Sequence, residues 1–116
     1  FEPTVLGRVP DDARIMNDEP FGPVAPIATF TSFEDVVERA NALPFGLAGY
    51  VFAKSLKTAT LAAEALEVGM VGVNDMLLAT AEAPFGGIKE SGMGREGGSI
   101  GIRDYLEPKY IKTKLI

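Results

Sequence analysis

The sequence has 116 residues, of which 47% are hydrophobic and 23% are charged, and its net charge is −5. This composition suits a small globular domain or part of a larger one, and the acidic balance disfavours nucleic acids and anionic membranes as partners. The sequence contains no cysteine and no histidine. Thiolate nucleophiles, Ser-His-Asp triads and most zinc sites are therefore excluded, and no metal site is expected.

The N-terminal part of the chain predicts two strands separated by a polar segment. Residues 3–9 read as a short extended piece with a β-prone centre, and residues 11–17 as a loop or a single helical turn. A turn at residues 21–23 then leads into an apolar run, residues 24–30, that predicts a buried strand. Because proline cannot donate to a strand ladder, Pro26 requires the start of this strand or a sheet edge.

A helix is predicted over residues 31–43. Thr31 is placed to cap its first turn, and Glu34, three residues later, would complete a capping box. Apolar residues recur at helical spacing between these ends, and Pro44 and Gly46 end the pattern.

The same alternation continues along the chain. A strand is predicted over residues 47–53, and a second helix is capped by Ser55 and runs to about Val68, with Gly69 as the left-handed residue after its end. A third strand covers residues 70–74. The order strand–helix–strand–helix–strand with short connections predicts an α/β fold, part of an open, mainly parallel βαβαβ sheet with flanking helices.

The last third of the sequence departs from this alternation. Residues 75–99 are rich in glycine and predict a long loop, kept ordered by apolar residues that include Phe85. A short helical turn is predicted over residues 100–105. Tyr110 to Ile116 then read as an exposed strand, and an exposed strand favours pairing with another chain. Lys89 and Arg95 are interpreted as surface or ion-pair residues.

Two motifs together carry a family resemblance. EPFGPV begins at Glu19 and PFGGIKESGMGRE begins at Pro84, with the βαβαβ pattern between them. In this order they resemble the C-terminal part of the NAD(P)-dependent aldehyde dehydrogenase superfamily, and the resemblance covers essentially the whole chain. The run GREGGSIGIRDYLEPKY, from Gly94, is similar to the succinate-semialdehyde dehydrogenase branch.

The resemblance assigns coenzyme contacts to the first motif. It implies that Glu19 hydrogen-bonds the ribose hydroxyls beside the nicotinamide of NAD or NADP, for which an ionised carboxylate can accept two donors at once. It implies that Phe21 lies against the nicotinamide end. Without the resemblance, Glu19 would be interpreted as an exposed loop carboxylate and Phe21 as a core anchor.

The resemblance also assigns a substrate region and an assembly element. Residues 75–82 correspond to the family stretch that shapes the aldehyde pocket, which makes Thr80 and Phe85 candidate substrate-pocket residues. The succinate-semialdehyde branch usually has two hydroxyl residues where this sequence has Thr80 alone, so the aldehyde stays open. Residues 106–116 correspond to an oligomerisation arm, and residues 1–105 to the C-terminal portion of the catalytic domain.

The family's nucleophilic cysteine, its glutamate base and its oxyanion-stabilising asparagine all lie upstream of Glu19, so no catalytic residue is expected in this chain. The resemblance therefore implies a fragment of a cytoplasmic, homo-oligomeric oxidoreductase that acts on a small aldehyde. Alone, the fragment is expected to be inactive. The alternative hypothesis is a free-standing α/β interaction module that dimerises through Tyr110 to Ile116.

Overall fold

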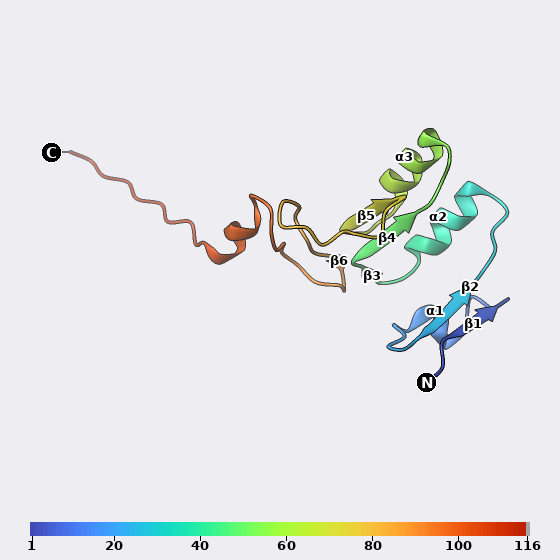
Figure 1. Cartoon of the computed structure of the whole chain (residues 1–116). Helices are drawn as coiled ribbons and strands as arrows, with labels where there is room; N and C mark the ends of the chain where they lie inside the picture. Colours follow the sequence, from blue (N-terminus) through green and yellow to red (C-terminus); the bar gives the residue numbers. More distant parts are fainter. Residues whose placement is uncertain (116) are drawn as a thin grey trace. The chain divides into compact units, whose positions relative to one another are not determined.

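The structure, a computed structural model, describes residues 1–115. It contains two compact units, Phe1–Leu43 and a second unit that begins at Pro44 (Figure 1). Each unit combines helices with small sheets, so the predicted α/β class is confirmed.

In the first unit, two parallel strands form a small sheet. Strand β1 (Thr4–Gly7) pairs with β2 (Val24–Ile27), and the short helix α1 (Arg14–Asn17) lies between them in sequence. Pro26 lies within β2, opposite Leu6. Proline is tolerated there because both strands of a two-stranded sheet are edge strands, and an edge leaves N–H positions that need no partner.

Helix α2 (Phe33–Asn41) completes this unit, and its cap lies one residue beyond the predicted position. Ser32 Oγ accepts a hydrogen bond from the Asp35 backbone N–H at 3.1 Å, and Asp35 Oδ2 accepts one from the Thr31 N–H at 3.4 Å. The prediction that Thr31 and Glu34 form a capping box is therefore wrong. The Asp35 carboxylate also lies one turn before Arg39, whose Nη1 is 3.8 Å from it.

In the second unit, a parallel strand pair is joined by a crossover helix. Strand β4 (Ala48–Val51) pairs with β5 (Met70–Val73), and helix α3 (Leu56–Ala65) connects them and packs against both (Figure 1). Ser55 Oγ accepts from the Thr58 N–H at 3.3 Å, so the predicted cap is confirmed. Ala59 on α3 is 1% exposed and is the only fully buried apolar side chain among residues 1–115. A small residue at this position allows the helix to approach the strands closely.

The predicted single open sheet is wrong for the described residues. Its three predicted strands form in chain order, but β2 pairs with β1, whereas β4 pairs with β5 in a separate sheet. A third sheet consists of β3 (Phe45–Gly46) and β6 (Ile88–Lys89), which pair antiparallel. The N-terminal extended piece pairs with one edge of β2, a long-range pairing that strand periodicity alone could not reveal.

Gly69 has a different role from the one predicted. Helix α3 ends at Ala65, and Gly69 does not have a positive φ. A Cβ at Gly69 would lie 2.0 Å from the carbonyl oxygen of Gly86 and 2.9 Å from the Cα of Gly87. The absence of a side chain therefore permits close backbone packing between the start of β5 and the glycine-rich segment.

Residues 75–99 include β6 and an isolated antiparallel bridge between Phe85 and Glu96. Positive φ values occur at four of their glycines: Gly92, Gly94, Gly97 and Gly98. The following 3-10 helix, η1 (Gly101–Tyr105), confirms the predicted helical turn.

The chain after η1 is extended and forms no strand up to residue 115 (Figure 1). The predicted strand Tyr110 to Ile116 is therefore absent from the single chain, and Ile116 lies outside the described residues. A strand that adds to a neighbouring chain has no ladder partner within its own chain, so this pairing stays a prediction, as does the domain division after residue 105.

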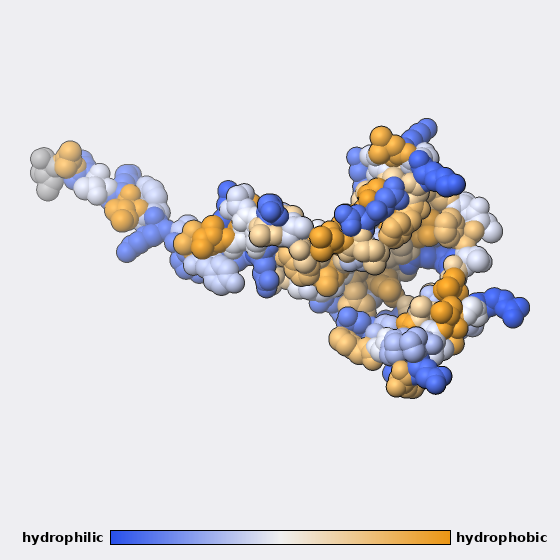
Figure 2. Space-filling model, in the orientation of Figure 1, coloured by the Kyte–Doolittle hydropathy of each residue, from blue (hydrophilic) through white to orange (hydrophobic). Residues whose placement is uncertain are grey.

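Large apolar side chains remain accessible on both units. Phe21 is 93% exposed in the first unit, and Leu56 and Met93 are 80% and 100% exposed in the second. Figure 2 shows such hydrophobic groups interspersed with hydrophilic ones over the visible face. Among residues 1–115, no helix has the length and apolar character required to cross a membrane.

Candidate functional site

The loop that carries Glu19 and Phe21 joins α1 to β2 and is fixed at both ends. At its start, the Asp18 N–H donates to the Arg14 carbonyl at 2.7 Å, and the Asp18 carboxylate accepts from the Arg14 guanidinium at 2.9 and 3.0 Å. At its end, the Thr4 N–H donates to the Pro23 carbonyl at 2.8 Å. The loop therefore presents its two predicted coenzyme residues from a short, anchored turn.

Both of these side chains are open to solvent. Glu19 is exposed, and its carboxylate has no hydrogen bond or ion pair with the part of the chain that the structure describes. The Phe21 ring is exposed as well, so it does not anchor a core formed by residues 1–115. An unpaired carboxylate beside an accessible ring can accept hydroxyl donors and contact a flat ring of a ligand.

Thr80 and Phe85, the predicted substrate-pocket residues, lie together in the second unit. Both line a hollow of about 420 Å³, whose other lining residues are Ala79, Ala81, Glu96 and Gly97. Phe85 is held by two backbone hydrogen bonds with Glu96, at 2.7 and 2.8 Å. Thr80 is exposed, so its hydroxyl is available to a ligand in this hollow.

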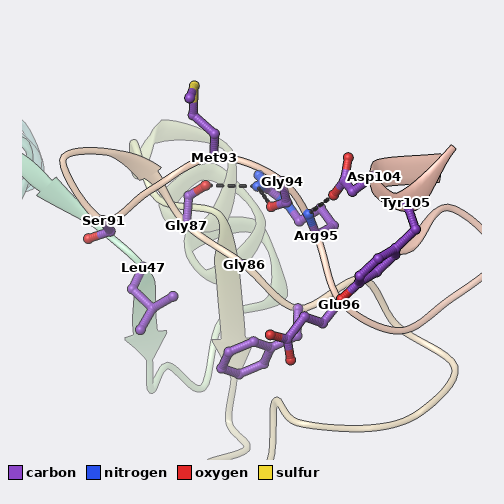
Figure 3. Close-up of a pocket in the computed structure, with 11 residues that line it drawn as sticks. Leu47, Gly86, Gly87, Ser91, Met93, Gly94, Arg95, Glu96, Asp104 and Tyr105 are labelled. Carbon is purple, nitrogen blue, oxygen red and sulfur yellow. Dashed lines mark hydrogen bonds between the residues drawn. The ribbon is translucent and has the colours of Figure 1, made fainter. Parts of the chain in front are cut away.

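Arg95 organises a neighbouring hollow of about 440 Å³ (Figure 3). Its Nη1 donates to the carbonyl oxygens of Gly87 and Gly94, each at 2.7 Å, and its backbone N–H donates to Asp104 Oδ2 at 2.6 Å. Figure 3 shows the Met93 side chain directed away from these contacts. Arg95 therefore links parts of the glycine-rich segment to one another and to η1. Its interpretation as a surface or ion-pair residue did not include this structural role.

Asn74 is interpreted from the sequence as a turn residue that closes a strand, and the structure adds the partners of its side chain. It follows β5 directly with φ +53°, a left-handed conformation that asparagine tolerates better than most residues. Its side chain pairs with the backbone of Ala53, just beyond β4. An asparagine at the end of an apolar strand was the available signal for such a turn.

The predicted site residues thus form two pairs. Glu19 and Phe21 share one loop of the first unit, and Thr80 and Phe85 share one hollow of the second. No group of three or more carboxylates within residues 1–115 could hold a metal ion.

Comparison with known proteins decides the family. The model of the aldehyde dehydrogenase family matches residues 1–111. The chain belongs to this family. The resemblance carried by the two motifs at Glu19 and Pro84 is therefore confirmed.

Individual aldehyde dehydrogenases resemble the chain closely. It is 49% identical over 111 residues to the succinate-semialdehyde dehydrogenase of Paenarthrobacter nicotinovorans, and the match covers 96% of the chain and 25% of that protein. It is 50% identical over 111 residues to the 3-sulfolactaldehyde dehydrogenase of Pseudomonas putida, covering 96% of the chain and 23% of that protein. The chain therefore spans about a quarter of the length of these dehydrogenases.

A solved structure supports the same placement. The chain superposes with a TM-score of 0.92 on an NADP-dependent enzyme of E. coli that is 49% identical, and the match covers 96% of the chain and 23% of that structure.

Proposed function

We propose that the chain forms part of an enzyme that oxidises an aldehyde to the carboxylic acid with NAD(P)+. The family match over residues 1–111 carries this proposal. The anchored loop with its unpaired Glu19 carboxylate and the hollow shared by Thr80 and Phe85 support it. When bound, the oxidised nicotinamide coenzyme supplies the hydride acceptor.

The first unit would contribute to coenzyme binding. The Glu19 carboxylate, exposed and without a protein partner among residues 1–115, is free to accept hydrogen bonds from ribose hydroxyls. The exposed Phe21 ring lies two residues away on the same anchored turn and would limit the positions open to the nicotinamide. These residues fit either NAD or NADP, because the adenosine half that distinguishes the two would be bound elsewhere.

The second unit would contribute one wall of the aldehyde pocket. The Thr80 hydroxyl can donate a hydrogen bond to a polar group of the substrate, and the Phe85 ring supplies an apolar surface beside it. The two relatives compared above are named for succinate semialdehyde and for 3-sulfolactaldehyde, and each of these aldehydes carries an anionic group. We therefore favour a small, acid-bearing aldehyde, with succinate semialdehyde as the first candidate.

The chain would supply neither the nucleophile nor the base. Its sequence contains no cysteine, so a thiolate that attacks the aldehyde carbon must come from other polypeptide. The isolated chain should therefore form no NAD(P)H.

The C-terminal segment would serve assembly. Tyr110, Ile111 and Leu115 are 86%, 73% and 90% exposed, on a segment that has no strand partner within residues 1–115. Such a segment suits addition to the sheet of a second copy, which supports a homo-oligomer and a boundary between residues 105 and 106. A cytoplasmic location stays a prediction.

The proposal is tested with the full-length protein that contains this sequence. NAD(P)H formation is followed by absorbance with succinate semialdehyde and with NAD+ or NADP+, and the isolated chain is assayed in parallel. We expect turnover by the full-length protein and none by the isolated chain. A full-length protein without turnover on any short aldehyde would contradict the proposed activity, and turnover by the isolated chain would contradict the assignment of the chemistry to other polypeptide.

A further inference from the structure

The turn Gly97–Gly98 lies against the backbone of the loop that carries Thr80. The Gly98 N–H donates to the Ala81 carbonyl at 2.9 Å. A Cβ at Gly97 would lie 3.0 Å from the carbonyl oxygen of Ala83, 3.4 Å from that of Ala81 and 3.7 Å from that of Thr80. The loop and the turn are therefore in direct backbone contact.

Gly98 extends this contact toward Phe85. A Cβ at Gly98 would lie 3.2 Å from the Glu82 carbonyl oxygen, 3.2 Å from the Pro84 nitrogen and 3.3 Å from Pro84 Cδ. The neighbours of both glycines are backbone or ring atoms, which cannot rotate away as a flexible side chain can. A side chain at either position would therefore require the loop between Thr80 and Phe85 to shift by a few tenths of an ångström, chiefly at Glu82, Ala83 and Pro84.

The conformation of the turn adds a second constraint. Gly97 and Gly98 have φ values of +68° and +57°, in the left-handed region that other residues rarely adopt. Gly97 also lines the hollow that contains Thr80 and Phe85. The same two residues thus form part of the wall of the hollow and fix the loop beside it.

We propose that the Gly97–Gly98 turn is a positioning element that sets the location of Thr80 and thereby the aldehyde preference of the enzyme. The inference rests on the proposed function. A methyl group at Gly97 displaces the Thr80 loop and weakens recognition of a polar substrate group, while the coenzyme loop at Glu19 belongs to the other unit and keeps its structure. A displacement of about 1 Å in a positioning group can reduce rates by roughly 100-fold, and a shift of a few tenths of an ångström should have a smaller effect.

Gly92 provides a matched control. It lies in the same glycine-rich segment and has φ +113°, so alanine there is strained as well, but a Cβ would meet nothing within 4 Å. Gly92→Ala therefore imposes backbone strain without the contact to the Thr80 loop, and this strain exceeds that at Gly97 because φ +113° lies outside the αL region. Gly98→Ala provides a second test variant, whose nearest contact of 3.2 Å is longer than the 3.0 Å at Gly97.

The experiment uses the full-length enzyme and two aldehydes, succinate semialdehyde and butanal, which lacks the carboxylate. We expect Gly97→Ala to lower the ratio of kcat/KM for succinate semialdehyde to that for butanal by roughly 10-fold. The KM for the coenzyme should stay within about twofold of wild type. Gly92→Ala should leave the substrate ratio unchanged.

An unchanged substrate ratio in a folded Gly97→Ala or Gly98→Ala enzyme would overturn the proposal. An equal change in Gly92→Ala would also overturn it, because that result would assign the effect to backbone strain. If neither test variant folds, the turn serves stability and the proposal is wrong. A wild-type enzyme inactive on both aldehydes would instead reject the proposed function on which the inference rests.

Discussion

Asn74 and Ala53 exchange two hydrogen bonds across the ends of neighbouring parallel strands. The Ala53 N–H donates to Asn74 Oδ1 at 2.9 Å, and Asn74 Nδ2 donates to the Ala53 carbonyl at 3.0 Å. The asparagine side chain thus continues the pairing of β4 and β5 by one step beyond the backbone ladder. It also fixes the point from which the Thr80 loop departs.

Two substitutions at Asn74 distinguish the contribution of its side-chain hydrogen bonds to stability from that of its backbone conformation. Asn74→Gly removes both hydrogen bonds but tolerates φ +53°, and Asn74→Ala removes the bonds and adds strain. We expect losses in the free energy of unfolding of about 1–3 kcal/mol for glycine and about 1 kcal/mol more for alanine. Thermal unfolding of the full-length variants checks this order. A glycine variant as stable as wild type would contradict the contribution of the side-chain pairing, and a glycine variant less stable than the alanine variant would contradict the strain assigned to φ +53°.

The close approach of Gly69 to Gly86 predicts a severe effect of the smallest side chain. A Cβ 2.0 Å from the Gly86 carbonyl cannot be accommodated without moving the backbone of the glycine-rich segment or of β5. We expect Gly69→Ala to lower the free energy of unfolding by about 3 kcal/mol or more and to reduce soluble expression. Gly22→Ala is the control, because a Cβ at Gly22 meets nothing within 4 Å and should change stability by less than about 0.5 kcal/mol.

The cap of α2 distinguishes two adjacent hydroxyl residues. Ser32→Ala removes the acceptor of the Asp35 N–H, and we expect a loss of about 1 kcal/mol in the free energy of unfolding. Thr31→Ala should cost much less, since Thr31 takes part in the cap through its backbone N–H. Chemical denaturation of both variants provides the comparison. Equal losses would contradict the assignment of the cap to Ser32.

The exposed C-terminal segment predicts an oligomer that depends on it. Truncation before Tyr110 should convert the full-length protein to a smaller assembly, because it removes Tyr110, Ile111 and Leu115 from the proposed interface. Size-exclusion chromatography with light scattering measures the change. An assembly of unchanged mass after truncation would reject the role of this segment.

Local signals in the sequence were sufficient to predict the helices and the strand–helix–strand unit of β4, α3 and β5. The periodicity of residues 55–68 and the Ser55 cap gave a helix that the structure places at Leu56–Ala65, between two parallel strands. The position of the α2 cap was missed by one residue because Thr31 and Ser32 are both able to cap, and only the reach of Asp35 decides between them.

Long-range relationships were not available from local patterns. The pairing of β2 with β1 depends on a short N-terminal strand of ordinary composition, and the packing of Gly69 depends on a segment 17 residues further along the chain. The first motif contains Glu19 and Phe21 and the second contains Phe85, whereas Thr80 lies outside both, and the binding roles of these residues stay predictions. The backbone partners of the Arg95 and Asn74 side chains required the structure, because local sequence patterns do not identify which distant backbone groups a side chain reaches.

Coenzyme binding by a Glu19 variant tests the central proposal most directly. The KM for NAD(P)+ is measured for full-length wild-type enzyme, for Glu19→Gln and for Asp12→Asn, which neutralises another exposed carboxylate of the first unit. Hydrogen bonds to a charged group contribute about 1.5–3 kcal/mol, so we expect the KM of Glu19→Gln to rise by at least roughly 10-fold. The KM of Asp12→Asn should not change. Equal coenzyme KM values for wild type and Glu19→Gln would contradict the assignment of this loop to the coenzyme.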